Sequence, residues 1–440
     1  MMIYKIIAVV TTVFFMNMAF ATEGLVEIYS LAVKADPLLR QSELSNQLVK
    51  ESKRESLSRW LPNISLAADV TNNFQKRTYD VSQFDGEEDY KSYGYSLTIN
   101  QPIFRYDNLI TNKKVNEQIN QSEVELSIAK QNLIIRVTES YFDLLSAQDN
   151  LNLLESEKKS VQRQLDQAEG RLEAGLSAVT EVFEARAQLD LINANIIEAR
   201  NQFKNRLELM REITDFYHDK LKPLNDSLKL TEPLLVGVKK WEELAVRNSL
   251  DVRRIQYIGK QLKYEIKRQK SGHYPTLDIA ARYSNSTSGG GDFGQSDTEN
   301  RTIALNFSLP IYQGGLVSSR TKSAVLNYEQ NQEKLIETMR LVRTKASKAY
   351  FGVLSSIARI KALSLSILSN EKALNAVEAE NKLGRRTITD VIRATHNLTR
   401  VHRDYNRVRY NYVLNRLKLK QSVGQLTEQD VFQVNAWLAS

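Results

Sequence analysis

The sequence contains no cysteine, so disulfides, thiolate metal sites, a cysteine nucleophile and an N-terminal lipid-modified cysteine are all excluded. Histidine is also rare. The four histidines show no metal-ligand spacing such as H-E-x-x-H, and G-x-S-x-G is absent. We therefore expect no metal, no cofactor and no enzymatic activity, and an exported hydrolase is disfavoured. These histidines are His218, His273, His396 and His402.

Glycine (17) and proline (7) are scarce for 440 residues, which favours long uninterrupted helices. Charged residues make up 25% of the chain and its mean hydropathy is −0.40, so most of it should contact water. The formal net charge is +8, but basic residues alternate with acidic ones rather than forming a block. Together with the export signal below, this argues against a nucleic-acid partner.

Residues 1–21 have the pattern of a secretory signal peptide. Lys5 precedes a short apolar run that ends in Ala19-Phe20-Ala21, an A-x-A cleavage pattern. Loss of Lys5 on cleavage would leave a mature charge of +7. In the mature chain we see no segment that approaches the roughly 20 apolar residues of a spanning helix, so we expect no transmembrane helix.

The remaining chain contains an internal sequence repeat. "LPNISLAADV" (61–70) matches "YPTLDIAARY" (274–283) at an offset of 213, and "SYFDLL" (140–145) matches "AYFGVL" (349–354) at an offset of 209. Such internal similarity predicts two structural repeats, and the change of offset predicts one longer surface loop. We place the repeats at 22–214 and 239–424, separated by 215–238 and followed by 425–440. These last two segments are expected to form an equatorial belt.

Each repeat contains two stretches in which apolar and polar residues alternate, predicting strands at 63–75, 93–103, 276–286 and 301–311. An apolar face, a polar face and tyrosine near one end fit outer-membrane barrel strands. A soluble sandwich would show the same alternation. However, four strands close neither a barrel nor a sandwich, and lipid tolerates no open sheet edge. The pattern therefore predicts a membrane barrel completed by several chains, with the polar loops 72–92 and 285–300 exposed.

Helical spacing covers the rest of each repeat. We predict one helix over 24–58 and one over 239–271, and long hairpins from 106–172 with 178–214 and from 317–383 with 388–422. A helix of some 65 residues spans roughly 100 Å. The fold class is thus mainly α, with coiled-coil-like hairpins forming an α-barrel and a small membrane β-barrel contribution.

A repeated phrase marks the hairpin tips, near 173–181 and 382–390. Gly175 and Gly384 are placed to end the first helix in a left-handed cap, and Thr180 and Thr389 are predicted N-caps of the returning helices. The following acids, Glu181 and Asp390, suit the positive end of the helix dipole. Capping alone would explain the motif. Yet tips far from the strands would also form a ring in an oligomer, where such charges set ion preference.

The chain resembles the outer-membrane efflux proteins of the TolC family over essentially all of its mature length. The resemblance rests on the doubled "GLSAVTEV" and "GRRTITDV", the paired "QPIF" (101–104) and "LPIY" (309–312), and "RYNYVLNRLKLKQSVGQLTEQD" (409–430). The last run, with the missing N-terminal cysteine, favours the TolC branch over the lipid-anchored drug-efflux branch.

Membership of this family would imply a homotrimer with one twelve-stranded barrel in outer-membrane lipid and a helical tunnel through the periplasm. It would also imply a periplasmic adaptor at the tips and an inner-membrane RND, ABC or MFS transporter, which supplies the energy. The implied function is an exit duct for small molecules or secreted proteins. The implied adaptor-docking residues are Gly175, Leu176, Thr180, Glu181, Gly384, Arg385, Thr387 and Thr389. We also assign Pro62, Pro102, Pro275 and Pro310 to strand starts.

The same resemblance assigns Asp390 to the periplasmic aperture and Arg386 to holding it closed. Two positions depart from the family pattern. Arg393 stands where a second aspartate is expected, and Asn381 stands where a tyrosine is expected. An aperture ring with Asp390 and Arg393 adjacent would carry about zero net charge, which predicts weaker cation selectivity and weaker block by multivalent cations than the family pattern with two aspartates.

Two other readings remain open. A periplasmic adaptor would show a single hairpin rather than a doubled chain. A coiled-coil structural protein of the envelope would leave the lipid-type strands unexplained. The sequence does not identify the cargo.

Overall fold

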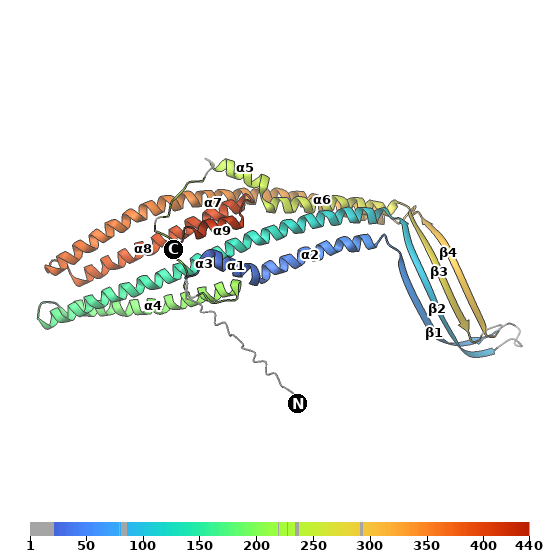
Figure 1. The fold of residues 1–440 in the computed structure, drawn as a ribbon, viewed down its shortest axis with the longest axis horizontal. Coiled ribbons are helices and arrows are strands. Elements are labelled where there is room, and N and C mark those ends of the chain that lie inside the picture. Colours follow the sequence, from blue (N-terminus) through green and yellow to red (C-terminus); the bar gives the residue numbers. More distant parts are fainter. Residues whose placement is uncertain are drawn as a thin grey trace, which may run out of the picture.

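The computed structural model describes residues 22–439 apart from 79, 81–85, 219, 227, 234–236 and 291–293. The predicted signal peptide therefore lies outside the described residues, as do parts of the strand loops and of the inter-repeat segment. The described chain is elongated. Long helices run along one axis, and a four-stranded sheet extends from one end of them (Figure 1).

The two repeats contribute two strands each to a single antiparallel sheet with the order β1-β2-β3-β4. These strands are β1 (Asn63–Arg77), β2 (Gly86–Phe104), β3 (Thr276–Ser288) and β4 (Ser296–Ser308). Strand β2 pairs with β3, so the central ladder joins the first half of the chain to the second. The repeats consequently share one sheet rather than forming two separate domains.

The hairpins of the sheet extend further than the sequence analysis expected. Strands β1 and β2 reach Arg77 and Gly86, so they enter the predicted loop 72–92; β3 and β4 likewise enter 285–300. Ladder pairing there continues through polar residues, such as Gln75 opposite Glu88, which give no apolar alternation. The prediction that the fourth strand reaches 311 was wrong, because β4 ends at Ser308.

The strand-start assignment was correct for two of the four prolines. Pro62 and Pro275 directly precede β1 and β3, whereas Pro102 lies near the end of β2 at a register shift and Pro310 follows the end of β4. Neighbouring strands are antiparallel, so at the end of the sheet nearest the helices β1 and β3 begin and β2 and β4 finish. Proline fits at these strand ends because it cannot donate a hydrogen bond to a ladder.

The two short-helix regions are each broken once, at equivalent positions. The first forms α1 (Leu25–Ala35) and α2 (Pro37–Ser58), and the second forms α5 (Val238–Asn248) and α6 (Leu250–Lys270). Asp36 and Ser249, which are 213 residues apart, cap the second helix of each pair. The prediction of single helices over 24–58 and 239–271 was therefore wrong. At each break one helix ends, and a second helix begins there with a side-chain N-cap.

Two long hairpins complete the fold. Helix α3 (Tyr106–Glu173) pairs with α4 (Val179–Thr214), and α7 (Leu316–Lys382) pairs with α8 (Ile388–Ser422). With 68 residues, α3 is about 100 Å long at 1.5 Å per residue. One apolar core joins parts of α1 to α5, α7, α8 and the short α9 (Glu428–Asn435), and a second core lies between α3, α4 and the start of α8 toward the tips.

One expectation about helices needs correction. Helix α7 is long and apolar enough over part of its length to cross a membrane, by length and composition alone. The stretch 351–368 is of this kind, and its only charged residues are Arg359 and Lys361. Val353, Ile357 and Ile360 of this stretch are nonetheless buried in the protein's own core. We therefore interpret this part of α7 as wall of the helical layer.

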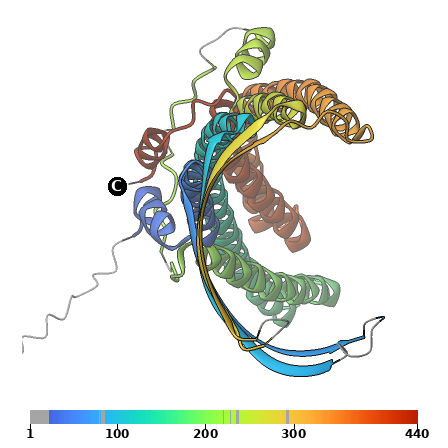
Figure 2. The same cartoon turned by 90° about the vertical axis from the view of Figure 1, so that its right-hand side faces the viewer.

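Viewed along the long axis, the helices and the sheet form one curved layer with a convex and a concave side (Figure 2). Helices α1, α5 and α9 lie on the convex side. Single bridges pair Glu23 with Leu221 and Leu224 with Leu438, so parts of 215–238 and 425–439 lie beside the start of the chain at the middle of the long axis.

Candidate functional site: the sheet face, the equator and the hairpin tips

One face of the sheet is apolar across all four strands. The ladder aligns Leu66 with Leu97, Leu97 with Tyr283, and Ala281 with Ile303, so the alternating apolar residues of every strand share this face. Val70 is 78% exposed and Ile303 is 84% exposed, which would be unfavourable in water for a patch this large. The same face carries Ile64, Leu66, Tyr93, Tyr95, Leu97, Ile99, Ile279, Tyr283, Leu305 and Phe307.

The opposite face of the sheet is polar, with Ser65 aligned with Thr98 and Thr98 with Arg282. On the apolar face, the band between Leu277 and Tyr283 covers six residue steps, or about 20 Å at 3.3 Å per residue. Tyr95 and Tyr283 are 6.1 Å apart between ring centroids at its far end. A band of this height with a tyrosine border matches the lipid-facing belt of an outer-membrane barrel.

The sheet has two open edges in the described chain. Strands β1 and β4 each pair on one side only, so their outer N–H and C=O groups have no ladder partner among the described residues. In hydrocarbon each such group costs several kcal/mol, which makes an open edge unstable there. The sheet is therefore complete as a membrane structure only when other strands pair with both edges.

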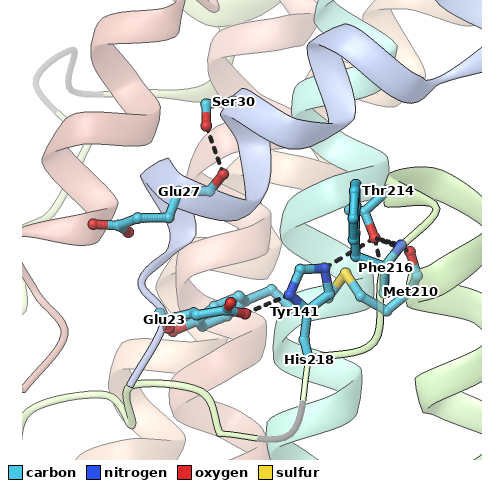
Figure 3. A network of polar contacts seen from close by, with 8 residues as sticks. All are labelled: Glu23, Glu27, Ser30, Tyr141, Met210, Thr214, Phe216 and His218. Carbon is cyan, nitrogen blue, oxygen red and sulfur yellow. Dashed lines mark hydrogen bonds and ion pairs between the residues drawn. The ribbon is translucent and has the colours of Figure 1, made fainter. Parts of the chain in front are cut away.

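At the equator, a buried polar network ties the start of the described chain to the inter-repeat segment (Figure 3). His218 contacts Glu23 through Nδ1 and hydrogen-bonds the Thr214 hydroxyl through Nε2 at 2.9 Å. The Tyr141 hydroxyl donates to the Lys222 carbonyl at 2.7 Å. Burial raises the pKa of Tyr141, so this hydroxyl stays protonated and available as a donor.

The tip between α3 and α4 is closed by backbone bonds. Gly175 has a φ of +70°, Gly175 N donates to Leu172 O at 2.9 Å and Leu176 N donates to Arg171 O at 2.8 Å. This is the glycine-ended cap that the sequence predicts. The N-cap of α4 is Ala178, which supplies no side-chain cap, and Ser177 donates instead to the Glu181 carboxylate at 2.8 Å.

The tip between α7 and α8 has the same backbone path but more side-chain bonds. Gly384 has a φ of +72°, and Thr387 and Asp390 form a reciprocal capping box at the start of α8. Hydrogen bonds from the Thr387 backbone and side chain lower the pKa of Asp390, so this carboxylate is charged at neutral pH. Asn381 adds a bond from Nδ2 to Arg386 O at 2.8 Å.

The predicted N-caps Thr180 and Thr389 were both wrong. The caps are Ala178 and Thr387, two residues earlier, because both returning helices begin sooner than the motif suggested. Thr389 instead donates to the Glu184 carboxylate of α4 and so links the two tips. The spacing Thr387-x-x-Asp390 is a capping-box signal that the sequence analysis passed over.

The aperture residues lie together at this second tip. Arg386 pairs with Glu380 at 3.1 Å, and both Arg386 and Arg393 lie close enough to Asp390 to stabilise its charged form. Leu176 and Arg385 are exposed at the ends of their turns, as docking residues would be. Their roles in gating and docking stay predictions. The structure adds Ile388, which is fully buried against the first hairpin and which the sequence analysis did not identify.

Comparison with known proteins agrees with this architecture. The family described as "Outer membrane efflux protein" matches residues 28–214 and 241–425, one match for each repeat. The outer membrane protein TolC of Escherichia coli (strain K12) is 32% identical over 424 residues, covering 94% of this chain and 84% of TolC. The proteases secretion protein PrtF of Dickeya chrysanthemi is 26% identical, covering 95% of this chain and 91% of PrtF.

Solved structures give the same result at the level of the fold. The Campylobacter jejuni CmeC outer membrane channel has a TM-score of 0.79 at 16% identity, covering 96% of this chain and 91% of CmeC. The Vibrio cholerae outer membrane protein VceC has a TM-score of 0.73 at 16% identity, covering 91% and 96%. With a lipid-type sheet, long periplasmic hairpins and matches over both repeats, this chain belongs to the outer membrane efflux protein family, the family of TolC.

Proposed function

We propose that this chain is the outer-membrane exit duct of an export system, working as a homotrimer with a periplasmic adaptor and an inner-membrane transporter. The sheet lies in the outer membrane and most of the chain lies in the periplasm. One observation carries the proposal: a sheet with an apolar face and two open edges lies at the end of polar, solvent-exposed helices about 100 Å long. That combination suits a duct that joins lipid to a distant partner.

The edges of the chain support completion by identical copies. Helix α2 leads into edge strand β1, and edge strand β4 leads into α7. Both helices have solvent-exposed leucines. Leu48 on α2 is 70% exposed, although a leucine in water contributes nothing to folding. Packing α2 of one copy against α7 of the next would bury the exposed leucines of both helices and would pair β1 of one copy with β4 of the other. Three copies give twelve strands, well above the eight of the smallest such barrels.

The hairpin tips are the proposed docking surface for the adaptor. Gly175, Leu176, Thr180 and Glu181 supply one tip, and Gly384, Arg385, Thr387 and Thr389 supply the other. The transporter would be of the RND, ABC or MFS class. The names of PrtF and of the alkaline protease secretion protein AprF support secreted proteins as cargo beside small toxic molecules.

The aperture is proposed to be formed by Asp390, Arg386 and Arg393. Arg386 pairs with Glu380, and Asp390 and Arg393 lie one turn apart on α8, so these charges offset one another and the ring carries about zero net charge. We expect weaker block by multivalent cations at this ring than in TolC. A conductance titration with Mg²⁺ that gives block equal to that of TolC would refute this part of the proposal.

Planar-bilayer recording tests the function directly. Purified mature protein should give stepwise currents, and outer-membrane vesicles from cells without the protein should lack those steps. Protein that inserts or extracts as a stable oligomer but gives no current would contradict the duct and favour the envelope coiled-coil structural reading.

A further inference from the structure

Helix α8 carries a row of basic side chains along one face. Between Ile388 and Val408, the exposed residues are five in number, and each of them is arginine or histidine. Their spacing alternates between three and four residues, which places all of them on one stripe of the helix. We call this row the α8 basic stripe; it consists of Arg393, His396, Arg400, Arg403 and Arg407.

The stripe points away from the convex side of the molecule. Further along α8, Arg409 pairs with Asp226 at 3.0 Å and Tyr412 accepts from Thr231 N at 2.9 Å. Arg409 and Tyr412 therefore face the inter-repeat segment 215–238, which we call the equatorial segment. At 100° per residue, Arg409 and Tyr412 lie about 200° and about 140° around the helix from Arg407. The equatorial segment lies on the convex side, so the stripe faces the concave side (Figure 2).

Neighbouring copies of the chain would not cover the stripe. Helix α8 has α7 on one side and α3 on the other, with His396 bonded to Glu157 of α3 at 2.9 Å and Tyr410 bonded to Asp149 of α3 at 2.6 Å. It is therefore an inner helix of the curved layer, whereas α4 and α7 lie at its edges. In a closed ring, the concave side becomes the wall of the tunnel, and the stripe faces its water.

Most of the positive charge in the stripe is unneutralised. His396 pairs with the buried Glu157, and Arg393 lies one turn from Asp390, whose charge offsets its own. No carboxylate of the described residues lies within ion-pair distance of the other three arginines of the stripe. Arg403 and Arg407 line a cavity of about 680 Å³ between α8, α3 and α4, together with Asp404 and with an Asp143–Arg206 pair at 2.9 Å. Asp390 lies at the tip end of the same helix. In the lining of this cavity the three arginines outnumber the two aspartates.

We infer that the periplasmic tunnel of this protein selects for anions and favours small anionic molecules as cargo. The inference rests on the proposed duct. Three copies would surround one water column with their α8 basic stripes, and charges that line a channel raise the local concentration of the opposite sign. Screening acts over about 8 Å at physiological salt, so the effect is strongest near the wall and in the narrowed tip region.

Reversal potentials in a KCl gradient across a planar bilayer test the inference. The wild-type channel should pass chloride over potassium by about threefold, as expected for a wide, partly screened charged pore. The triple variant R400Q/R403Q/R407Q should bring this ratio to about one or below. The matched control is K158Q/K159Q/R163Q, which removes the same charge from exposed α3 residues that line a separate groove between α3 and α4. It should leave the ratio unchanged.

A second measurement needs no variant. Inorganic pyrophosphate on the periplasmic side should reduce the wild-type current at lower concentration than hexaamminecobalt(III) does. Current steps that favour potassium, or an equal response of the two triple variants, would overturn the inference and leave the duct intact. A complete absence of current would overturn the duct itself, and the inference with it.

Discussion

The two halves of the chain repeat the same breaks and turns, but they fix them with different bonds. At the helix break, Asp36 accepts from Leu39 N at 2.7 Å and pairs with Arg136 at 2.7 Å, whereas Ser249 only accepts from Asp251 N at 3.2 Å. At the tips the order is reversed, because the second half has the capping box and the first has an uncapped Ala178. A duplicated backbone can thus keep its path while its local stability is redistributed.

The largest expected effect is at the helix breaks. Asp36→Ala removes both a cap and the partner of Arg136 from a buried position, so we expect a loss of about 2–3 kcal/mol. Ser249→Ala should cost only about 1 kcal/mol. Urea unfolding in detergent, followed by the helical circular dichroism signal, measures both. Equal losses of unfolding free energy in the two variants would show that the two helix breaks are equally stabilised, which would contradict the difference proposed between them.

The next effect concerns the place where the halves meet below the sheet. Arg268, with help from Lys114 of the first half, lowers the pKa of Glu265 to about 2. Since this pKa is lower in the folded state, its stabilisation is complete above about pH 4.3 and is lost as pH falls toward 2. We expect about 1 kcal/mol after solvent screening.

Glu265→Gln should therefore lower the unfolding midpoint at pH 7 and flatten its change between about pH 4.5 and 2. Glu51→Gln is the matched control, because within the described part of the chain Glu51 forms only an exposed i,i+3 pair with Arg54. If Glu265→Gln keeps the full acid dependence of the wild type, the Lys114–Glu265 contact does not hold the halves together.

The smallest effect is at the tips, where the comparison can be inverted. Thr387→Ala should speed hydrogen exchange of the first amides of α8 about fivefold, the equivalent of about 1 kcal/mol. Ala178→Thr supplies the missing cap at the equivalent position, three residues before Glu181, and should slow exchange at the start of α4 by a similar factor. No change in either variant would mean that the capping box does not make the second tip the more stable one.

Much of this architecture was predictable, because it depends on strong periodicities and on a doubled sequence. The apolar alternation located the four strands, and Gly175 and Gly384 located both tips. The breaks at Asp36 and Ser249 were missed because apolar residues keep helical spacing on both sides of them. The strand ends near Arg77, Gly86 and Ser296 were missed because ladder bonds continue where no face is apolar.

The contacts between distant segments could not be predicted in the same way. His218 with Glu23 and Thr389 with Glu184 join residues about two hundred positions apart, and neither side chain belongs to a periodic pattern. The α8 basic stripe was visible in the sequence only as interleaved charge. Its meaning depends on which side of α8 faces the equator, which only the fold supplies.

The most direct test of the account is the mass of the native particle extracted from outer membranes in mild detergent. The account predicts a particle of three mature chains, since only neighbouring copies can pair the open edges of β1 and β4. A monomer recovered from the soluble periplasm would leave the apolar sheet face and both edges without partners and would contradict the shared barrel.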